Sequence, residues 1–240
     1  MMKLVQLETC ESTNDEAWKH LPETTLVLTR VQTRGRGRQG RSWADNEGNI
    51  MASLALVPEP GLDAHFTWVP LASGIAACEA CELVAGRTLA GLRLKWPNDI
   101  MWEKAKMGGI LCESKITGDR ISGLVIGFGL NVVKAPSVPD VLTTCLNDHA
   151  PVQNDARAKI VGHWAERLQF WLSELAQGRT TRLRETWLAY ARLDSFPEFT
   201  AHDRAGQAVK LKALDLDDLG RLKASPEAND SKIIYLDQAP

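Results

Sequence analysis

The sequence predicts an α+β protein, with one large domain over residues 1–195 and a small β module over residues 196–240. Segments rich in β-branched residues alternate with segments whose apolar residues recur at helical spacing. Residues 123–133 form a nearly continuous apolar run, as is typical of a central strand. After Pro197 the chain changes to short alternating segments separated by turn residues, which indicates a module too small to rely on a core of its own.

The first half of the chain predicts three strands and two helices. Residues 4–7 form a short strand pattern, and a capping-box pattern predicts a helix over residues 13–20. The β-branched residues of 25–31 and the apolar residues of 50–57 predict two more strands. Apolar and small residues at helical spacing over 67–84 predict a buried helix.

The second half predicts strands over 92–96 and 109–115, followed by the apolar run 123–133. Gly127 and Gly129 interrupt this run, and internal glycines mark places where another group approaches the backbone closely. An amphipathic helix is then expected over residues 155–176, with Ile160, Trp164, Leu168, Trp171 and Leu175 on one face. A second helix is expected over 181–193, and short strands over 208–212 and 233–236.

Composition excludes several classes of protein. The net charge of -2 argues against a protein whose main task is to coat nucleic acid. No run approaches the roughly 18 apolar residues of a membrane span, and the N-terminus lacks a signal-peptide pattern. The five cysteines have no framework spacing, and the pair Cys78 and Cys81 lies in a helical apolar pattern, so reduced thiols are expected instead of a metal site. These observations predict a soluble cytoplasmic protein.

The most unusual segment is residues 30–43, with five arginines, three glycines and no acidic residue. Guanidinium groups make bidentate contacts to phosphate and carboxylate oxygens, and glycines let the backbone approach a ligand closely. Such a segment is either a phosphate-binding loop or a nucleic-acid-binding tag.

Four other segments carry polar groups suited to chemistry, although each has an ordinary structural interpretation when taken alone. Ser12-Thr13-Asn14 stands at a predicted helix start and is otherwise a simple N-cap. Lys95-Trp96-Pro97-Asn98-Asp99 ends a predicted strand and is otherwise solvated. Lys106-Met107-Gly108-Gly109-Ile110-Leu111 is otherwise a hairpin turn with a surface lysine. Gly127-Phe128-Gly129-Leu130-Asn131 places an amide after a glycine-punctuated strand.

In this order and spacing, the arginine-glycine segment and its four companions resemble the biotin protein ligase family over essentially the whole chain. The resemblance implies a mixed β-sheet flanked by helices, of the biotin/lipoate ligase and class II synthetase type, followed by a small SH3-like β-barrel. It also implies a two-step ATP-dependent reaction. Biotin is first activated as biotinyl-5′-AMP, and is then transferred to a lysine of a biotin carboxyl carrier protein domain.

The resemblance assigns roles residue by residue. Lys106 and Arg38 are the expected catalytic residues. The expected biotin-binding residues are Ser12, Thr13, Asn14, Gln32, Gly35, Arg36, Gly37, Arg38 and Lys106. The expected ATP- and adenylate-binding residues are Arg36, Arg38, Trp43, Lys95, Asn98, Lys106 and Asn131. Mg²⁺ is an expected cofactor beside the substrates ATP and biotin, with Asp99 as a candidate ligand, directly or through another group.

The resemblance to the family's catalytic domain begins almost at residue 1, with no N-terminal winged helix-turn-helix before it. The repressor activity of bifunctional family members is therefore not expected. Neither nucleic acid nor a membrane is an expected partner, and the protein is expected to be a monomer or a homodimer. Three alternatives remain. A lipoate or octanoate ligase or transferase would share the broad fold, an RNA-binding module would use the arginine-glycine segment, and a biotin sensor would bind without transfer.

Overall fold

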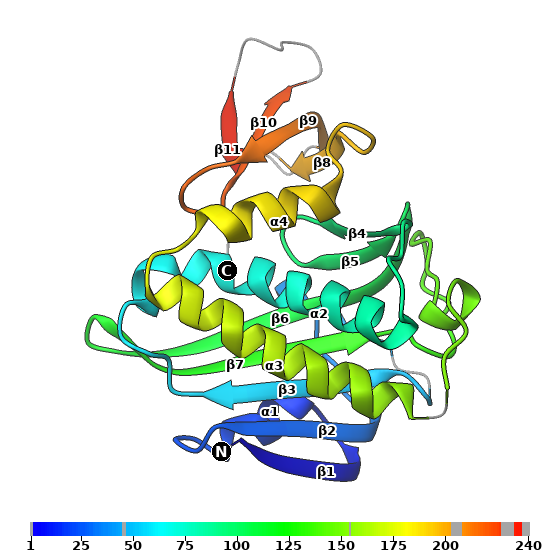
Figure 1. The fold of residues 1–240 in the computed structure, drawn as a ribbon, viewed down its shortest axis with the longest axis vertical. Helices are drawn as coiled ribbons and strands as arrows, with labels where there is room; N and C mark the ends of the chain where they lie inside the picture. The colour runs from blue at the N-terminus through cyan, green and yellow to red at the C-terminus, as the bar shows by residue number, and fades with distance from the viewer. Residues whose placement is uncertain (1, 45–46, 154, 203–207, 227–232, 237–240) are drawn as a thin grey trace.

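A seven-stranded mixed sheet forms the body of the molecule (Figure 1). The computed structural model describes residues 2–44, 47–153, 155–202, 208–226 and 233–236. The strand order is β1-β2-β3-β7-β6-β5-β4. β1 and β2 are parallel, and all other neighbours are antiparallel. The strands are β1 (Lys3–Cys10), β2 (Thr25–Gln32), β3 (Ile50–Leu56), β4 (Leu92–Lys95), β5 (Asp99–Trp102), β6 (Ala105–Thr117) and β7 (Arg120–Leu130).

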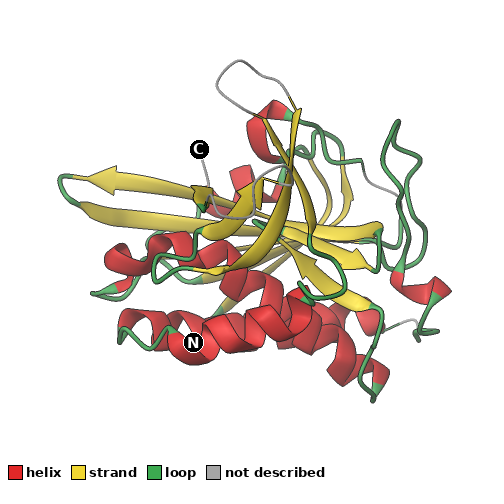
Figure 2. Ribbon diagram, turned by 90° about the horizontal axis from the view of Figure 1, so that it is seen from above, coloured by secondary structure: helices red, strands yellow, loops and turns green. Residues whose placement is uncertain are grey.

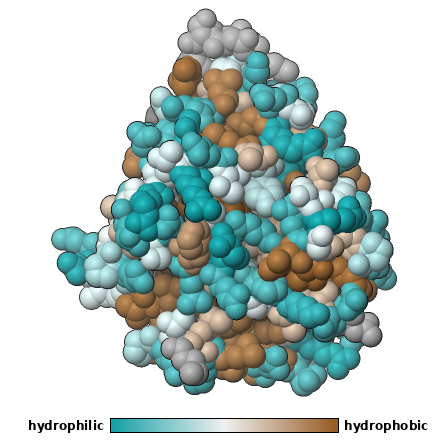
Figure 3. All heavy atoms as spheres, in the orientation of Figure 1, coloured by the Kyte–Doolittle hydropathy of each residue, from teal (hydrophilic) through white to brown (hydrophobic). Residues whose placement is uncertain are grey.

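Two long helices, α2 (Val69–Ala85) and α3 (Ala156–Ala176), form a layer on one face of this sheet (Figures 1 and 2). The five apolar side chains predicted to share one face of α3 are all buried, because that face packs into the main core. The short helix α1 (Thr13–Trp18) packs on the other face, in a separate small cluster with Val27, Ala55 and Val125. The surface on the side of the long helices is mainly hydrophilic, with apolar side chains in small groups (Figure 3).

A four-stranded antiparallel sheet, in the order β11-β10-β9-β8, follows the last helix, α4 (Thr181–Ala191). Its strands are β8 (Glu198–His202), β9 (Ala208–Leu216), β10 (Leu222–Pro226) and β11 (Ile234–Leu236). The turn before β10 is bound to the large domain, because Trp96 Nε1 donates to Gly220 O and Trp68 Nε1 donates to Asp218 O, both at 3.1 Å. Closure into an SH3-like barrel and a boundary at residue 195/196 stay predictions, since residues 203–207, 227–232 and 237–240 lie outside the described part of the chain.

The predicted elements are present, although β6 begins at Ala105 instead of residue 109 and β7 spans Arg120–Leu130 instead of 123–133. Three strands were missed, β5, β8 and β10, because each has only four or five residues, too few to display a clear strand period, and each carries polar residues. α1 ends at Trp18, two residues before the expected end. The helical stretch Leu62–Ala85 is long and apolar enough to cross a membrane, contrary to expectation, but 67% of its most apolar window is buried, as in a core helix.

Candidate active site

A cleft of about 540 Å³ opens beside α1, and it gathers the predicted site residues from distant parts of the chain. All of them except Gly35 line it: Ser12, Thr13, Asn14, Gln32, Arg36, Gly37, Arg38, Trp43, Lys95, Asn98, Asp99, Lys106 and Asn131. They come from the start of α1, the end of β2, the arginine-glycine segment, the β4–β5 turn, the beginning of β6 and the residue after β7.

Glycines on the central strands make room for this cleft. Successive residues of a strand point to opposite faces, so Val125, Gly127 and Gly129 of β7 share the face on which α1 lies. A Cβ at Gly129 would lie 2.7 Å from Trp43 Cε2, and one at Gly127 would overlap Asn14 Oδ1. The predicted close approach at both glycines is therefore confirmed. Larger side chains here would push out the tryptophan and the asparagine.

One end of the cleft carries an uncharged chain of hydrogen bonds. Gln32 Oε1 accepts from the Thr13 backbone N–H at 2.8 Å. Ser53 Oγ lies 2.8 Å from Thr13 Oγ1 and 2.6 Å from Asn14 Oδ1. Ser12, Thr13 and Asn14 are buried. Ser12 is the N-cap of α1 but makes no side-chain capping bond, so these side chains face the cleft instead of closing the helix.

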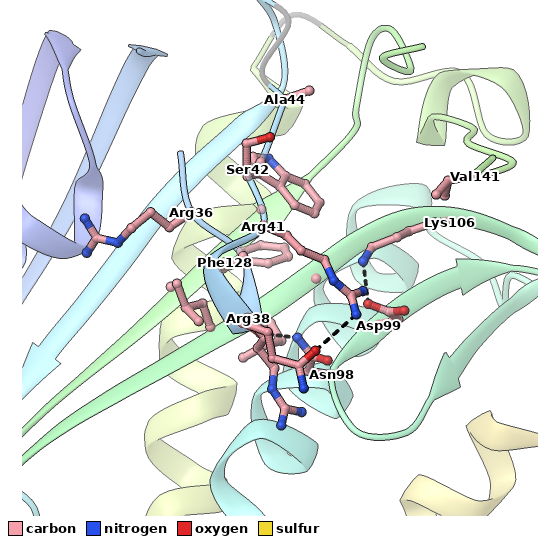
Figure 4. Close-up of a pocket in the computed structure, with 18 of the residues that line it drawn as sticks. Arg36, Arg38, Arg41, Ser42, Ala44, Asn98, Asp99, Lys106, Phe128 and Val141 are labelled. Carbon is pink, nitrogen blue, oxygen red and sulfur yellow. Dashed lines mark hydrogen bonds and ion pairs between the residues drawn. The ribbon is translucent and has the colours of Figure 1, made fainter. Parts of the chain in front are cut away.

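The other end is charged. Lys106 Nζ donates to Asp99 Oδ1 at 2.6 Å, and it lies 5.7 Å from the centre of the Trp43 ring (Figure 4). Asn98 is held by the β6 backbone, because its Nδ2 donates to Ile110 O at 2.6 Å. Lys95 pairs with Asp99 across β4 and β5. A lysine ammonium and a short polar loop are thereby placed at the same edge of the sheet.

The two central arginines of the segment have different surroundings. Arg36 donates to both oxygens of Asp15, at 2.6 and 2.7 Å, and to Glu113 at 3.2 Å. It points toward the N-terminal elements and away from Lys106 (Figure 4). These bonds hold the pKa of Asp15 below its usual value. Burial lowers the pKa of Arg38, which lines the cleft with its charge less screened by water. The expectation that both arginines hold phosphate therefore fits Arg38 better than Arg36.

Gly35 does not line the cleft but supports it. A Cβ there would lie 2.6 Å from Gln32 Nε2 and 2.7 Å from Trp43 O. The Trp43 backbone N–H donates to Gly35 O at 2.8 Å. Gly35 thus lets the arginine-glycine segment turn back on itself directly behind Gln32.

Two buried polar atoms at the charged end lack partners within the described part of the chain. Trp43 Nε1 is a donor and Asn131 Oδ1 is an acceptor, and neither is hydrogen-bonded. Asn131 is 2% exposed, and its Nδ2 donates to Thr144 O at 3.1 Å, which orients the free oxygen. Because an unpaired buried polar group costs free energy, these two atoms are unsatisfied positions on residues that line the cleft.

Comparison with known proteins agrees with this geometry. The model of the Biotin/lipoate A/B protein ligase family matches residues 6–131. The chain belongs to this family. A biotin–[acetyl-CoA-carboxylase] ligase of Paracoccus denitrificans is 31% identical over 192 residues, covering 75% of this chain and 78% of that protein.

Two solved structures have the same fold as this family member. The biotin protein ligase of Aquifex aeolicus, in complex with biotin and ATP, aligns with a TM-score of 0.76 at 22% identity, covering 98% of this chain and 95% of that one. The biotin protein ligase of Leishmania major, in complex with biotinyl-5-AMP, aligns with a TM-score of 0.65 at 25% identity, covering 98% of both chains. The predicted mixed sheet flanked by helices is thus confirmed.

Several residues in or beside this cleft were missed from the sequence. Ser53 and Glu113 do not line the cleft but hydrogen-bond to Asn14, which does, and a polar residue within a strand is a signal that could have identified them. The remaining ones have no local signal, because their position depends on how distant segments pack: Met51, Pro136, Val138, Val141, Thr143, Phe199, Thr200 and Leu236. The last three bring the C-terminal sheet to the rim of the cleft.

None of the five cysteines lines the cleft. All five are free, in agreement with the predicted reduced thiols. Within the ranges that the structure describes, no group of three or more His, Cys, Asp or Glu side chains could hold a metal ion.

Proposed function

We propose that this chain is a biotin protein ligase, which forms biotinyl-5′-AMP from biotin and ATP and transfers the biotinyl group to a lysine of a biotin carboxyl carrier protein domain. The observation that carries the proposal is the polarity of the cleft. An uncharged donor–acceptor chain at Thr13, Asn14 and Gln32 suits the ureido head of biotin, whereas Lys106 and Arg38 suit anionic groups. The similarity to the Paracoccus denitrificans ligase supports the same substrates.

The first step requires two anions to meet. A carboxylate oxygen of biotin attacks the α-phosphorus of ATP, the bond to the bridging oxygen breaks, and pyrophosphate leaves with the electron pair. The Lys106 ammonium, oriented by Asp99 at 2.6 Å, offsets the repulsion between carboxylate and phosphate and stabilises the charge that develops on the α-phosphate oxygens. Arg38 adds a second cation whose partial burial strengthens its field.

The second step consumes the mixed anhydride. The uncharged amine of the carrier lysine attacks the acyl carbon, the bond to the phosphate oxygen breaks, and AMP leaves while the amine loses a proton. Water would attack the same carbon, so the intermediate needs shielding. The arginine-glycine segment supplies this cover, since residues 37–39 and 41–43 line the cleft and Trp43 lies near Lys106.

Mg²⁺ suits this site only as a substrate-bound ion. Mg²⁺ prefers six oxygen ligands, and in nucleotide sites it takes one or two carboxylates together with phosphate oxygens and water. Asp99 offers one carboxylate at the charged end, and Lys106 already occupies one of its oxygens. We propose that phosphate oxygens hold the ion beside Asp99, where it would neutralise charge on the polyphosphate.

The test is pyrophosphate release by the purified chain with ATP and either biotin, lipoate or octanoate. We expect release only with biotin, followed by labelling of a biotin carrier domain. Equal rates with lipoate would refute the choice of substrate. Binding of biotin without pyrophosphate release would favour the sensor alternative.

A further inference from the structure

Glu113 of β6 joins α1 to the arginine-glycine segment from behind the cleft wall. Its Oε2 accepts hydrogen bonds from Asn14 Nδ2 and Trp18 Nε1, both at 3.1 Å, and its Oε1 accepts from Arg36 at 3.2 Å. The side chain is 29% exposed, so it is partly shielded from water. Three donors therefore converge on one carboxylate that none of the sequence motifs includes.

This carboxylate decides the direction of the hydrogen bonds at the uncharged end of the cleft. An ionised carboxylate can only accept, so the Asn14 amide must turn its NH₂ toward Glu113 and its Oδ1 toward Ser53. The Ser53 hydroxyl has a single hydrogen, and Asn14 Oδ1 can only accept it. Ser53 therefore donates to Asn14. The Thr13 hydroxyl lies 2.8 Å from Ser53 Oγ and 3.2 Å from Gln32 Oε1, so its one hydrogen goes to one of these two oxygens.

We propose that Glu113 is a positioning residue for biotin binding. It fixes which atoms of Thr13 and Asn14 are left to donate to, or accept from, the ureido group, and it does so without lining the cleft. This role rests on the biotin ligase function proposed above.

A simpler role is that Glu113 only anchors Arg36. Asp15 allows the two roles to be separated, because it binds the same guanidinium through two hydrogen bonds of 2.6 and 2.7 Å. Asp15→Asn weakens this anchor and leaves the bond between Asn14 and Glu113 in place. Glu113→Gln weakens the anchor and also presents an amide NH₂ to groups that are themselves donors.

The experiment is a steady-state comparison of full-length variants in the biotin-dependent pyrophosphate assay. Glu113→Gln should raise the biotin KM about tenfold or more, the factor that ~1.4 kcal/mol represents, with the ATP KM and kcat near wild type. Glu113→Asp keeps the carboxylate and should give a biotin KM between wild type and Glu113→Gln. Asp15→Asn should have a smaller effect, and Glu59→Gln, at an exposed glutamate, should have none.

Thermal unfolding of each variant accompanies the kinetics. A biotin KM for Glu113→Gln no higher than that of Asp15→Asn overturns the proposal, as does a loss of stability and kcat with biotin KM unchanged. Should Glu113→Gln fail to fold, Glu113→Asp decides: a raised biotin KM supports the role and a wild-type value overturns it. Absence of biotin-dependent release from the wild type overturns the proposed function together with this role, a result distinct from an active wild type with unaffected variants.

Discussion

The substitution Gly129→Ala uses a single methyl group to test the charged end of the cleft, where Trp43 is expected to contact ATP. A Cβ at this position would lie 2.7, 2.8 and 3.0 Å from Cε2, Cζ2 and Nε1 of Trp43. Carbon atoms in contact prefer about 3.5–4.0 Å, so one of the two groups must move. β7 is paired with β3 and β6 on its two sides, whereas Trp43 lies in the connection between β2 and β3. The indole ring is therefore the group that shifts.

The magnitude follows from the cost of overpacking. An extra methyl group in a packed site costs about 1–3 kcal/mol. We expect this cost to weaken ATP binding, because the displaced indole ring must return to its wild-type position to contact the nucleotide. Converted to a ratio of dissociation constants, the same range is a factor of roughly 5 to 140. We therefore expect the ATP KM of Gly129→Ala to rise within this range, with the biotin KM near wild type because Gly129 faces Trp43 and not Asn14.

The assay is the initial rate of pyrophosphate release at saturating biotin over a range of ATP concentrations. The matched control is Gly162→Ala in α3, where a Cβ meets nothing within 4 Å. Alanine in a helix interior stabilises by about 0.5–1 kcal/mol relative to glycine, so the control should unfold at a higher temperature with unchanged kinetics. An unchanged ATP KM in Gly129→Ala, or a rise confined to the biotin KM, would refute the placement of the nucleotide beside Trp43.

Three further outcomes are expected. Lys106→Ala should lower the adenylation rate by about 10²–10³-fold, the usual effect of losing a donor to developing charge, and near-normal activity would remove Lys106 from the mechanism. Arg38→Gly should speed release of the adenylate in a single-turnover experiment with labelled biotin, and an unchanged release rate would contradict its proposed role. Arg36→Ala should destabilise the protein at neutral pH, and the difference from wild type should diminish as the pH falls below about 4, the pKa of an ordinary aspartate. The bonds from Arg36 lower the folded-state pKa of Asp15, so their contribution is complete above about pH 4 and is lost as the pH falls through that lowered pKa. Urea unfolding from pH 7 to 3 measures it, and a pH-independent difference would exclude this pair as its source.

Most of the site could be predicted because its residues cluster in short segments that each end or begin an element. Thr13 and Asn14 start α1, Lys106 opens β6, and Asn131 follows β7. The partners of these residues were not predictable. Arg36 meets Glu113 across 77 positions of sequence, and Trp18 meets the same carboxylate across 95. No local pattern encodes such separations.

The three missed strands have a related explanation. β5 has four residues, and β8 and β10 have five each, too few for a periodic pattern to emerge. Hydrogen bonds to neighbouring strands define each of them: β4 and β6 define β5, β9 defines β8, and β9 and β11 define β10. Pairing between strands, and not local preference, sets their limits.

Local patterns in the chain are sufficient to identify the family, the long helices, the main strands and the set of residues that serve the cleft. Spatial packing alone decides how that set divides into an uncharged end and a charged end. The arginine-glycine segment shows this most clearly, because Arg36 and Arg38 are chemically identical and two residues apart. Arg36 is drawn to Asp15 and Glu113, while Arg38 is partly buried at the cleft. Their difference arises from which carboxylates the folded sheet brings within reach, and a linear sequence does not contain those distances.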